Sequence, residues 1–139
     1  MTGRRAWLVL AGLALGAACA SGPSEPELDF YTRVVFGFPS LVPEVTAGSG
    51  EIVVTGLLAT KSAGFTLHGE LLQPTPRSLV VKITAAETGA GVALRTQHYF
   101  AATIRPLAAV PHDLTLIYVV SGDGRDSTEL LRTAVTPGR

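Results

Sequence analysis

SLVVKITAA, residues 78–86, places an apolar side chain at every second position, which is the two-residue period of a β-strand. The positions predicted to face a core are Leu79, Val81, Ile83 and Ala85. Lys82 and Thr84 fall between them and therefore face outward. Because a strand with one apolar face belongs to a sheet that covers a core on that side, the stretch predicts a β protein with packed sheets.

Short strands of the same kind are predicted on both sides of this stretch, with turn residues about every 8 to 14 positions. Residues 127–135 suit either a short helix or a last strand, and we favour a strand because a threonine-rich ending suits a sheet edge. The predicted strands are 52–59, 64–72, 78–86, 92–105, 114–120 and 127–135, with 29–38 as an extended edge segment. Their predicted inward-facing residues are Phe65, Leu67, Leu71, Leu94, His98, Phe100, Ala102, Ile104, Leu114, Leu116, Tyr118 and Val120.

Three connections are predicted to be loops because proline, glycine, serine and aspartate gather there: residues 73–77, 106–113 and 121–126. Pro74 and Pro76 in the first of them lack the N–H that a sheet ladder needs. Loops carried by a rigid sandwich are common binding sites. We therefore expect any partner to be bound by loops of this kind at one end of the domain.

Six or seven short strands in about 90 residues indicate an all-β fold, an antiparallel β-sandwich of about seven strands, with a barrel as the alternative. One stretch resembles immunoglobulin-like and carboxypeptidase-regulatory-like domains on exported bacterial proteins. In it a strand (residues 100–107) is followed by a proline-bearing corner (Pro111) and an alternating return strand (114–116). Those domains usually have a glycine at the corner and a tyrosine at the start of the return strand, where this chain has Asp113 and Leu114. The resemblance implies an immunoglobulin-like sandwich.

The first 18 residues have the three parts of a secretory signal peptide. Arg4 and Arg5 are followed by an apolar run, Ala6 to Ala18, that ends in small residues. This run of about 13 residues is too short to cross a hydrocarbon core, which takes about 20. The sequence therefore predicts export of the chain and not a permanent membrane helix.

Cys19 is the single cysteine of the chain and follows this run directly. Two modes of processing remain open: ordinary cleavage after Ala20, at an A-x-A site, or lipidation of Cys19. Residues 15–19, Leu-Gly-Ala-Ala-Cys, resemble the lipobox of bacterial lipoproteins, although Gly16 stands where that family prefers leucine. The resemblance implies a diacylglycerol on Cys19, and two or three acyl chains hold a protein firmly on a bilayer. With Ala20 next to it, we expect a cell-envelope lipoprotein, in the outer membrane if the cell has two membranes.

Composition defines the rest of the chain as one domain on a tether. Residues 19–28 are small, acidic and proline-bearing, as in a flexible tether, and residues 29–139 form the predicted β-domain, with a core at about 48–139. Without Arg4 and Arg5 the chain keeps nine of its 11 basic residues against 11 acidic ones. Because the basic residues are also scattered singly, we expect no nucleic-acid partner.

Candidate catalytic and metal-binding residues do not form a recognisable motif. His68, His98 and His112 have no ligand spacing, and we expect one surface, one semi-buried and one loop histidine instead of a zinc site. Asp113, Asp123 and Asp126 match no calcium loop. No nucleophile, metalloprotease or phosphate-loop motif occurs.

The sequence thus predicts a lipid-anchored extracytoplasmic binding or structural module without catalytic activity, cofactor or metal. Its partners are the membrane, through Cys19, and a protein or glycan at the cell envelope. Two alternative functions are less favoured: a β-sandwich protease inhibitor, whose glycine-rich and Arg-Pro-Trp-type loop motifs are missing, and a metal-dependent enzyme.

Overall fold

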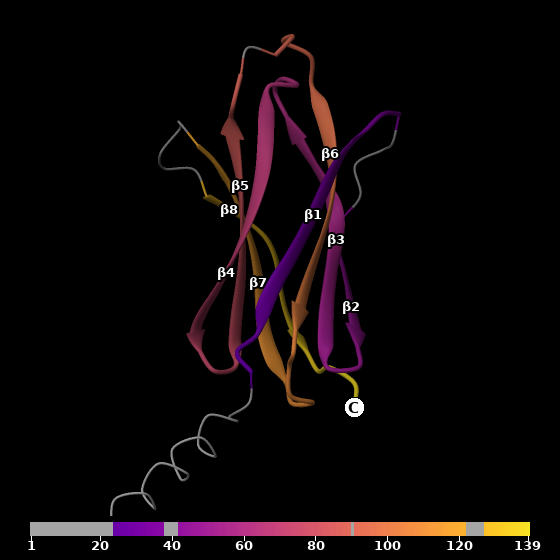
Figure 1. Ribbon diagram of the computed structural model, residues 1–139, viewed down its shortest axis with the longest axis vertical. Helices are drawn as coiled ribbons and strands as arrows, with labels where there is room; N and C mark the ends of the chain where they lie inside the picture. Colours follow the sequence, from indigo (N-terminus) through magenta and orange to yellow (C-terminus); the bar gives the residue numbers. More distant parts are fainter. Residues whose placement is uncertain (1–23, 38–41, 90, 122–126) are drawn as a thin grey trace, which may run out of the picture.

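The computed structural model of the protein describes residues 24–37, 42–89, 91–121 and 127–139. These residues form eight β-strands and no helix (Figure 1). The strands are β1 (Glu27–Val35), β2 (Glu44–Gly48), β3 (Glu51–Thr60), β4 (Phe65–Thr75), β5 (Ser78–Glu87), β6 (Thr96–Arg105), β7 (His112–Val120) and β8 (Ser127–Val135). The all-β prediction is confirmed, and so is a strand at Ser127–Val135.

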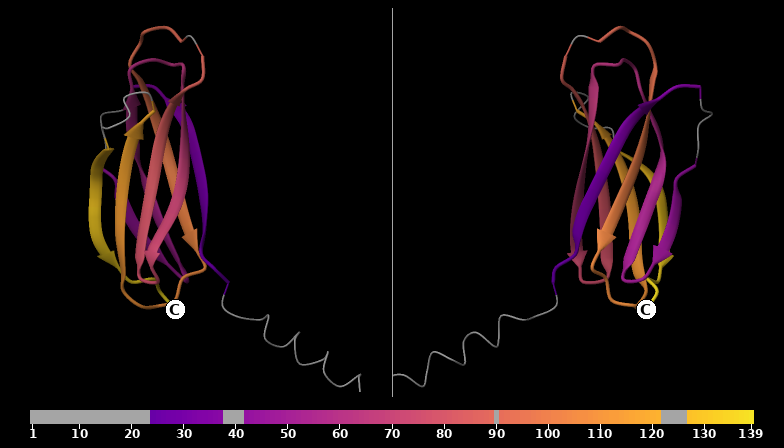
Figure 2. Two further views of the ribbon diagram at one scale, coloured as in Figure 1. Left: turned by 90° about the vertical axis from the view of Figure 1, so that its left-hand side faces the viewer. Right: turned by 45° about the vertical axis from the view of Figure 1, so that its right-hand side comes forward.

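Two four-stranded sheets pack face to face, as the two views of Figure 2 show. Sheet A has the strand order β1-β6-β3-β2, and sheet B has the order β4-β5-β7-β8. All neighbouring strands are antiparallel except β5 and β7, which are parallel. The parallel pair arises because the chain leaves β5 for β6 in the opposite sheet and then returns as β7, so that β5 and β7 run in the same direction side by side.

This arrangement differs from the predicted sandwich in two respects. There are eight strands instead of about seven, because β2 was not predicted. Pro43 and the Gly48-Ser49-Gly50 turn obscured its five residues, which pair with β3 up to that turn. The sandwich is also mostly, and not entirely, antiparallel, because a pairing between strands from separate hairpins has no local signal in the sequence.

Alternation along the strands produces the core. In β3, β5 and β6 every second residue is buried, and the alternate residues are partly exposed. The completely buried residues include every inward position that the sequence predicted in β5. Both sheets contribute to one cluster of buried apolar residues: Ile52, Val54, Leu58, Phe65, Leu67, Leu79, Val81, Ile83, Ala85, Phe100, Ala102, Ile104, Leu114 and Leu116.

Several predicted boundaries were wrong. The loop predicted at 73–77 is a turn of only two residues, because β4 continues to Thr75 through a register shift after Leu72 that accommodates Pro74. At another boundary β6 begins at Thr96, so Leu94, which was predicted to lie in the core, is 63% exposed. β1 begins at Glu27, within the segment predicted as tether, and is an edge strand of sheet A, as predicted for the segment 29–38.

The two ends of the sandwich differ in what they carry (Figure 1). The near end is the end where β1 begins, and it also holds the β4–β5 turn, the β6–β7 connection and the C-terminus. There Gly138 donates its backbone N–H to Gly48 O (2.8 Å) and accepts one from Gly50 N (3.0 Å). The far end holds the end of β1, the β3–β4 turn and the β5–β6 connection.

Candidate binding surface at the far end

The loops predicted to bind a partner do not gather at one end. The turn after Thr75 and the connection before His112 lie at the near end, beside the entry of the N-terminal chain (Figure 1). Ser121, which follows β7, lies at the far end, and the rest of the predicted loop, 122–126, falls outside the described residues. The three candidate loops therefore do not share one end, and binding of a partner by one of them stays a prediction.

Large apolar side chains are exposed at the far end instead. Phe36 follows β1 and is 81% exposed, while Val92 and Leu94 precede β6 and are 77% and 63% exposed. These side chains lie outside the strands, in segments that bury little of their apolar surface. Apolar residues that gather at the surface in this way commonly mark an interaction site.

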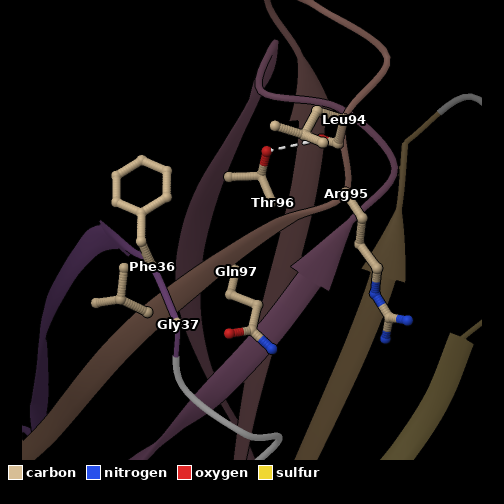
Figure 3. Close-up of a pocket in the computed structure, with 7 residues that line it drawn as sticks. Phe36, Gly37, Leu94, Arg95, Thr96 and Gln97 are labelled. Carbon is tan, nitrogen blue, oxygen red and sulfur yellow. Dashed lines mark hydrogen bonds between the residues drawn. The ribbon is translucent and has the colours of Figure 1, made fainter.

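A notch of about 400 Å³ separates Phe36 from Leu94 (Figure 3). The last paired residues of β1 and β6 are Val35 and Gln97, and beyond this pair the two segments diverge. Gly37 makes the divergence possible, because its φ of 74° lies in the left-handed region that other residues rarely adopt. We call this hollow the far-end notch; its lining is Val35, Phe36, Gly37, Leu94, Arg95, Thr96 and Gln97.

The floor of the notch is held in place by a hydrogen bond. Thr96 donates its hydroxyl to the Leu94 carbonyl at 2.9 Å, which fixes the backbone just before β6 (Figure 3). Gln97 lies between the two apolar walls and contributes an amide that both donates and accepts hydrogen bonds (Figure 3).

Arg95 gives the far-end notch a positive charge. Among the described residues no carboxylate lies within ion-pair distance of its guanidinium. A guanidinium without such a partner can bind a carboxylate through two parallel hydrogen bonds. The notch therefore combines two apolar walls, a polar floor and one cation, which suits an apolar group that lies next to a carboxylate.

A second, smaller hollow of about 170 Å³ lies at the same end, between the sheets. Tyr118 donates a long hydrogen bond (3.4 Å) to the Ala59 carbonyl there, and burial raises the pKa of the Tyr118 hydroxyl. The Lys61 ammonium lies 5.7 Å from the centre of the Phe65 ring, at a distance typical of a cation–π contact.

His98 lies beneath this hollow as part of a buried hydrogen-bond chain. Thr60 donates its hydroxyl to the Ser62 carbonyl (2.8 Å), so its oxygen accepts the hydrogen bond from His98 Nε2 at 2.9 Å. His98 is 4% exposed, and burial lowers its pKa below the ordinary value of 6.5. A neutral imidazole with its proton on Nε2 satisfies this geometry, which indicates a structural role.

The three histidines lie in three different places. His98 faces the core near the far end, His68 is exposed on sheet B, and His112 is the first residue of β7 at the near end. The prediction that His112 is a loop histidine was wrong, since it is 4% exposed and its Nε2 bonds to the Ala108 carbonyl at 3.1 Å. Within the described ranges, no three His, Cys, Asp or Glu side chains gather in a group that would hold a metal ion.

The acidic candidates do not form a site either. Asp113 is exposed in β7, and Asp123 and Asp126 fall outside the described residues. The predicted signal peptide and Cys19 also lie outside them. In the part of the chain that the structure covers, no helix has the length and apolarity needed to cross a membrane.

Comparisons with known proteins add no family. The chain matches no protein-family model, and no curated protein or solved structure is significantly similar to it.

The far-end notch was missed because its residues were assigned to strands. Leu94 continues the alternation of Phe100, Ala102 and Ile104 and therefore resembled a core position. The predicted strand 92–105 begins directly after the turn residues 88–91, so these residues gave no signal that β6 begins only at Thr96.

Proposed function

We propose that the protein is a lipid-anchored binding module of the bacterial cell envelope, with an immunoglobulin-like sandwich as its scaffold. Lipidation of Cys19 attaches the chain to a membrane, and residues 20–26 connect this anchor to β1. The module binds its partner and does not convert it.

One observation carries this proposal: the exposed apolar residues Phe36, Val92 and Leu94 lie at the end opposite the start of β1. Phe36, Leu94 and Arg95 line the far-end notch, whereas β1 begins at the near end (Figures 1 and 3). An anchor at the near end leaves the far end turned away from the membrane and open to a partner. A rigid sandwich holds that surface in a fixed shape, as in other domains that bind through their loops.

The chemistry of the notch favours a protein partner with an apolar side chain next to a carboxylate. Phe36 and Leu94 provide apolar walls, and Arg95 supplies the cation. Aromatic and arginine side chains are enriched at sites that contribute most of a binding energy.

A photo-crosslinking experiment tests the proposal. The full chain, expressed in its natural membrane, carries a photoreactive phenylalanine analogue at position 94 in one sample and at position 84 in another. Thr84 is the matched control because it lies on the outer face of β5, away from the notch. We expect a crosslinked partner at position 94 that is lost when Phe36→Ser and Arg95→Ala are added.

Crosslinks of equal yield at positions 94 and 84 would contradict the far-end site. Loss of the crosslink in a Cys19→Ser chain, with the notch unchanged, would show that anchoring is needed for the encounter. Retention of the crosslink in that chain would separate the anchor from the binding site.

A further inference from the structure

The outer face of sheet A is an uncovered surface with few charges in its middle. Outward-facing residues of β1, β6 and β3 are exposed or partly exposed there. Tyr31 is 55% exposed and lies beside Ala101 in the strand register. It is on the edge strand β1, and its row of residues marks the centre of the face along the strand direction. The other uncharged residues around this centre are Val53, Thr55, Leu57, Tyr99 and Thr103.

Charges of opposite sign lie on the two sides of this centre. Asp29 is two residues before Tyr31 and Arg33 is two residues after it, so each lies about 6.6 Å from Tyr31 along β1. Farther toward the near end, Glu27 and Glu51 add negative charge, which Arg105 offsets in part. Toward the far end the face carries Arg33 and then Arg95.

Arg33 is preordered for an ion pair. Its guanidinium carbon lies 5.3 Å from the centre of the Tyr99 ring, which keeps the side chain flat along the face. Within the described ranges no carboxylate is close enough to pair with it. Asp29 reaches only Arg105, at 3.8 Å and with both side chains well exposed, and such a pair contributes little to stability.

Sheet B has no such separation of charge. On its outer face the register places Glu70 opposite Lys82, and Arg132 lies 3.2 Å from Glu129. The cations of sheet B therefore have acidic neighbours on the same face, whereas Arg33 and Arg95 of sheet A have no carboxylate within ion-pair distance among the described residues.

We propose that the outer face of sheet A binds a second copy of this chain, with the strands of the two copies antiparallel. A two-fold axis that crosses the strands at Tyr31 brings Arg33 of each copy opposite Asp29 of the other. The same axis places Val53 of each copy opposite Leu57 of the other. Because the face is complementary to itself under this rotation, one surface forms both halves of the contact.

The composition of the face agrees with a contact between proteins. Tyrosine and arginine, which are enriched in protein interfaces, lie on its strands β1 and β6, and no lysine lies on the described part of the face. Four strands about 4.8 Å apart, with five outward positions on β1, β6 and β3 and three on β2, offer about 570 Å² per copy. That area is at the low end for a specific interface, so the dimer is weak.

One residue opposes the contact. Glu44 lies in the same row as Tyr31, opposite Thr55 in the register, so the two-fold axis brings it near Glu44 of the other copy. Like charges in this position weaken the dimer. Removing this charge therefore has the opposite effect from removing the charge of Arg33.

The dimer has a consequence for the position of the N-terminal chains. Because the strands of the two copies run in opposite directions, the chains that precede β1 leave at opposite ends of the dimer. Two membrane-anchored copies would then join two facing membrane surfaces. The far-end notch stays open in both copies, so the dimer does not rest on the proposed function.

Sedimentation equilibrium tests the proposal on a chain that begins at Ser24, which contains all eight strands and the whole buried core. Over about 1 μM to 1 mM protein we expect a monomer–dimer equilibrium. Arg33→Asp and Asp29→Arg should each weaken the dimer at least tenfold, and the double variant should recover most of the affinity. Glu44→Gln should tighten the dimer, and Lys82→Glu, on sheet B, should leave it unchanged.

Circular dichroism of every variant checks that the fold is retained. We expect it to be retained, because the substituted side chains are exposed or partly exposed. A chain that stays monomeric at 1 mM would overturn the proposal. The proposal would also be overturned if the double variant dimerised no more tightly than the single variants. In a parallel dimer, or in a contact with another molecule, Asp29 and Arg33 do not face each other, so the double variant would recover no affinity. Loss of the dimer in Lys82→Glu would place the contact on sheet B and would also overturn the proposal.

Discussion

Phe30 of β1 stacks on Phe100 of β6, with ring centres 6.2 Å apart and ring planes inclined by 19°. Two glycines make room for this pair. A Cβ atom on Gly69, in the opposite sheet, would lie 2.5 Å from the Phe30 ring, and one on Gly56 would lie 2.9 Å from the Phe100 ring. Both distances are far below van der Waals contact, so the phenylalanine pair and the glycines are one packing unit that joins the two sheets.

Gly69→Ala should destabilise the domain by about 1 to 3 kcal/mol, because the added methyl group overpacks the site beneath Phe30. Denaturant unfolding followed by circular dichroism measures the loss. Gly89→Ala is the control, since a Cβ atom there meets nothing within 4 Å. The loss should shrink when Phe30→Leu accompanies Gly69→Ala, and an unchanged loss in the double variant would contradict the assigned contact.

Phe100→Ala and Leu116→Ala should each cost about 2 to 5 kcal/mol of unfolding free energy. Both side chains are completely buried, one in each sheet, and their truncation leaves cavities in the shared core. Ile117→Ala, on the partly exposed side of the same strand as Leu116, is the matched control and should cost less. A neutral Leu116→Ala would place the inward face of β7 out of register.

Stability should decrease as the pH falls below about 6.5, because His98 is held neutral in the fold. Its pKa is lowered by burial, while the unfolded chain keeps the ordinary value of 6.5. The unfolded state therefore binds the proton first, and the contribution of neutral His98 is complete above pH 6.5 and lost as the pH falls toward the folded pKa. The slope is at most about 1.4 kcal/mol per pH unit.

His98→Gln keeps an N–H group for the Thr60 hydroxyl but does not titrate, so it should flatten the pH dependence of unfolding below pH 6.5. His68→Gln, on the exposed face of β4, is the control. An equal flattening in both variants would show that the pH dependence arises elsewhere.

Cys19→Ser should abolish lipidation and normal processing of the leader, if residues 15–19 act as a lipobox. Metabolic labelling with a radioactive fatty acid and mass spectrometry of the mature N-terminus measure both effects. A natural chain that begins at Ser21 and carries no label would refute the lipid anchor. Ordinary cleavage after Ala20 would then be the correct alternative.

The sequence alone determined the β-strands wherever alternation is strict. In β5 the apolar positions 79, 81, 83 and 85 are all completely buried, because a period of two places them on one face whatever the strand pairs with. The edge segment β1 was identified from its β-branched and aromatic residues, and the strand at Ser127–Val135 from its threonine-rich ending after a turn. The local pattern is sufficient there because each strand specifies its own inner and outer face.

Only the tertiary structure decided which strands are neighbours. It also decided where a strand begins within an alternating stretch, and which segments lie together at each end of the sandwich. The parallel pair β5 and β7 and the register of β1 on β6 join residues far apart in the chain, and no local pattern encodes such pairings. Leu94 kept the apolar rhythm of β6 but lies outside it, because the strand begins only where β3 supplies a hydrogen-bonding partner at Thr60. The far-end notch and the charge pattern of sheet A therefore exist only once the strands are placed side by side, since each combines side chains from separate parts of the sequence.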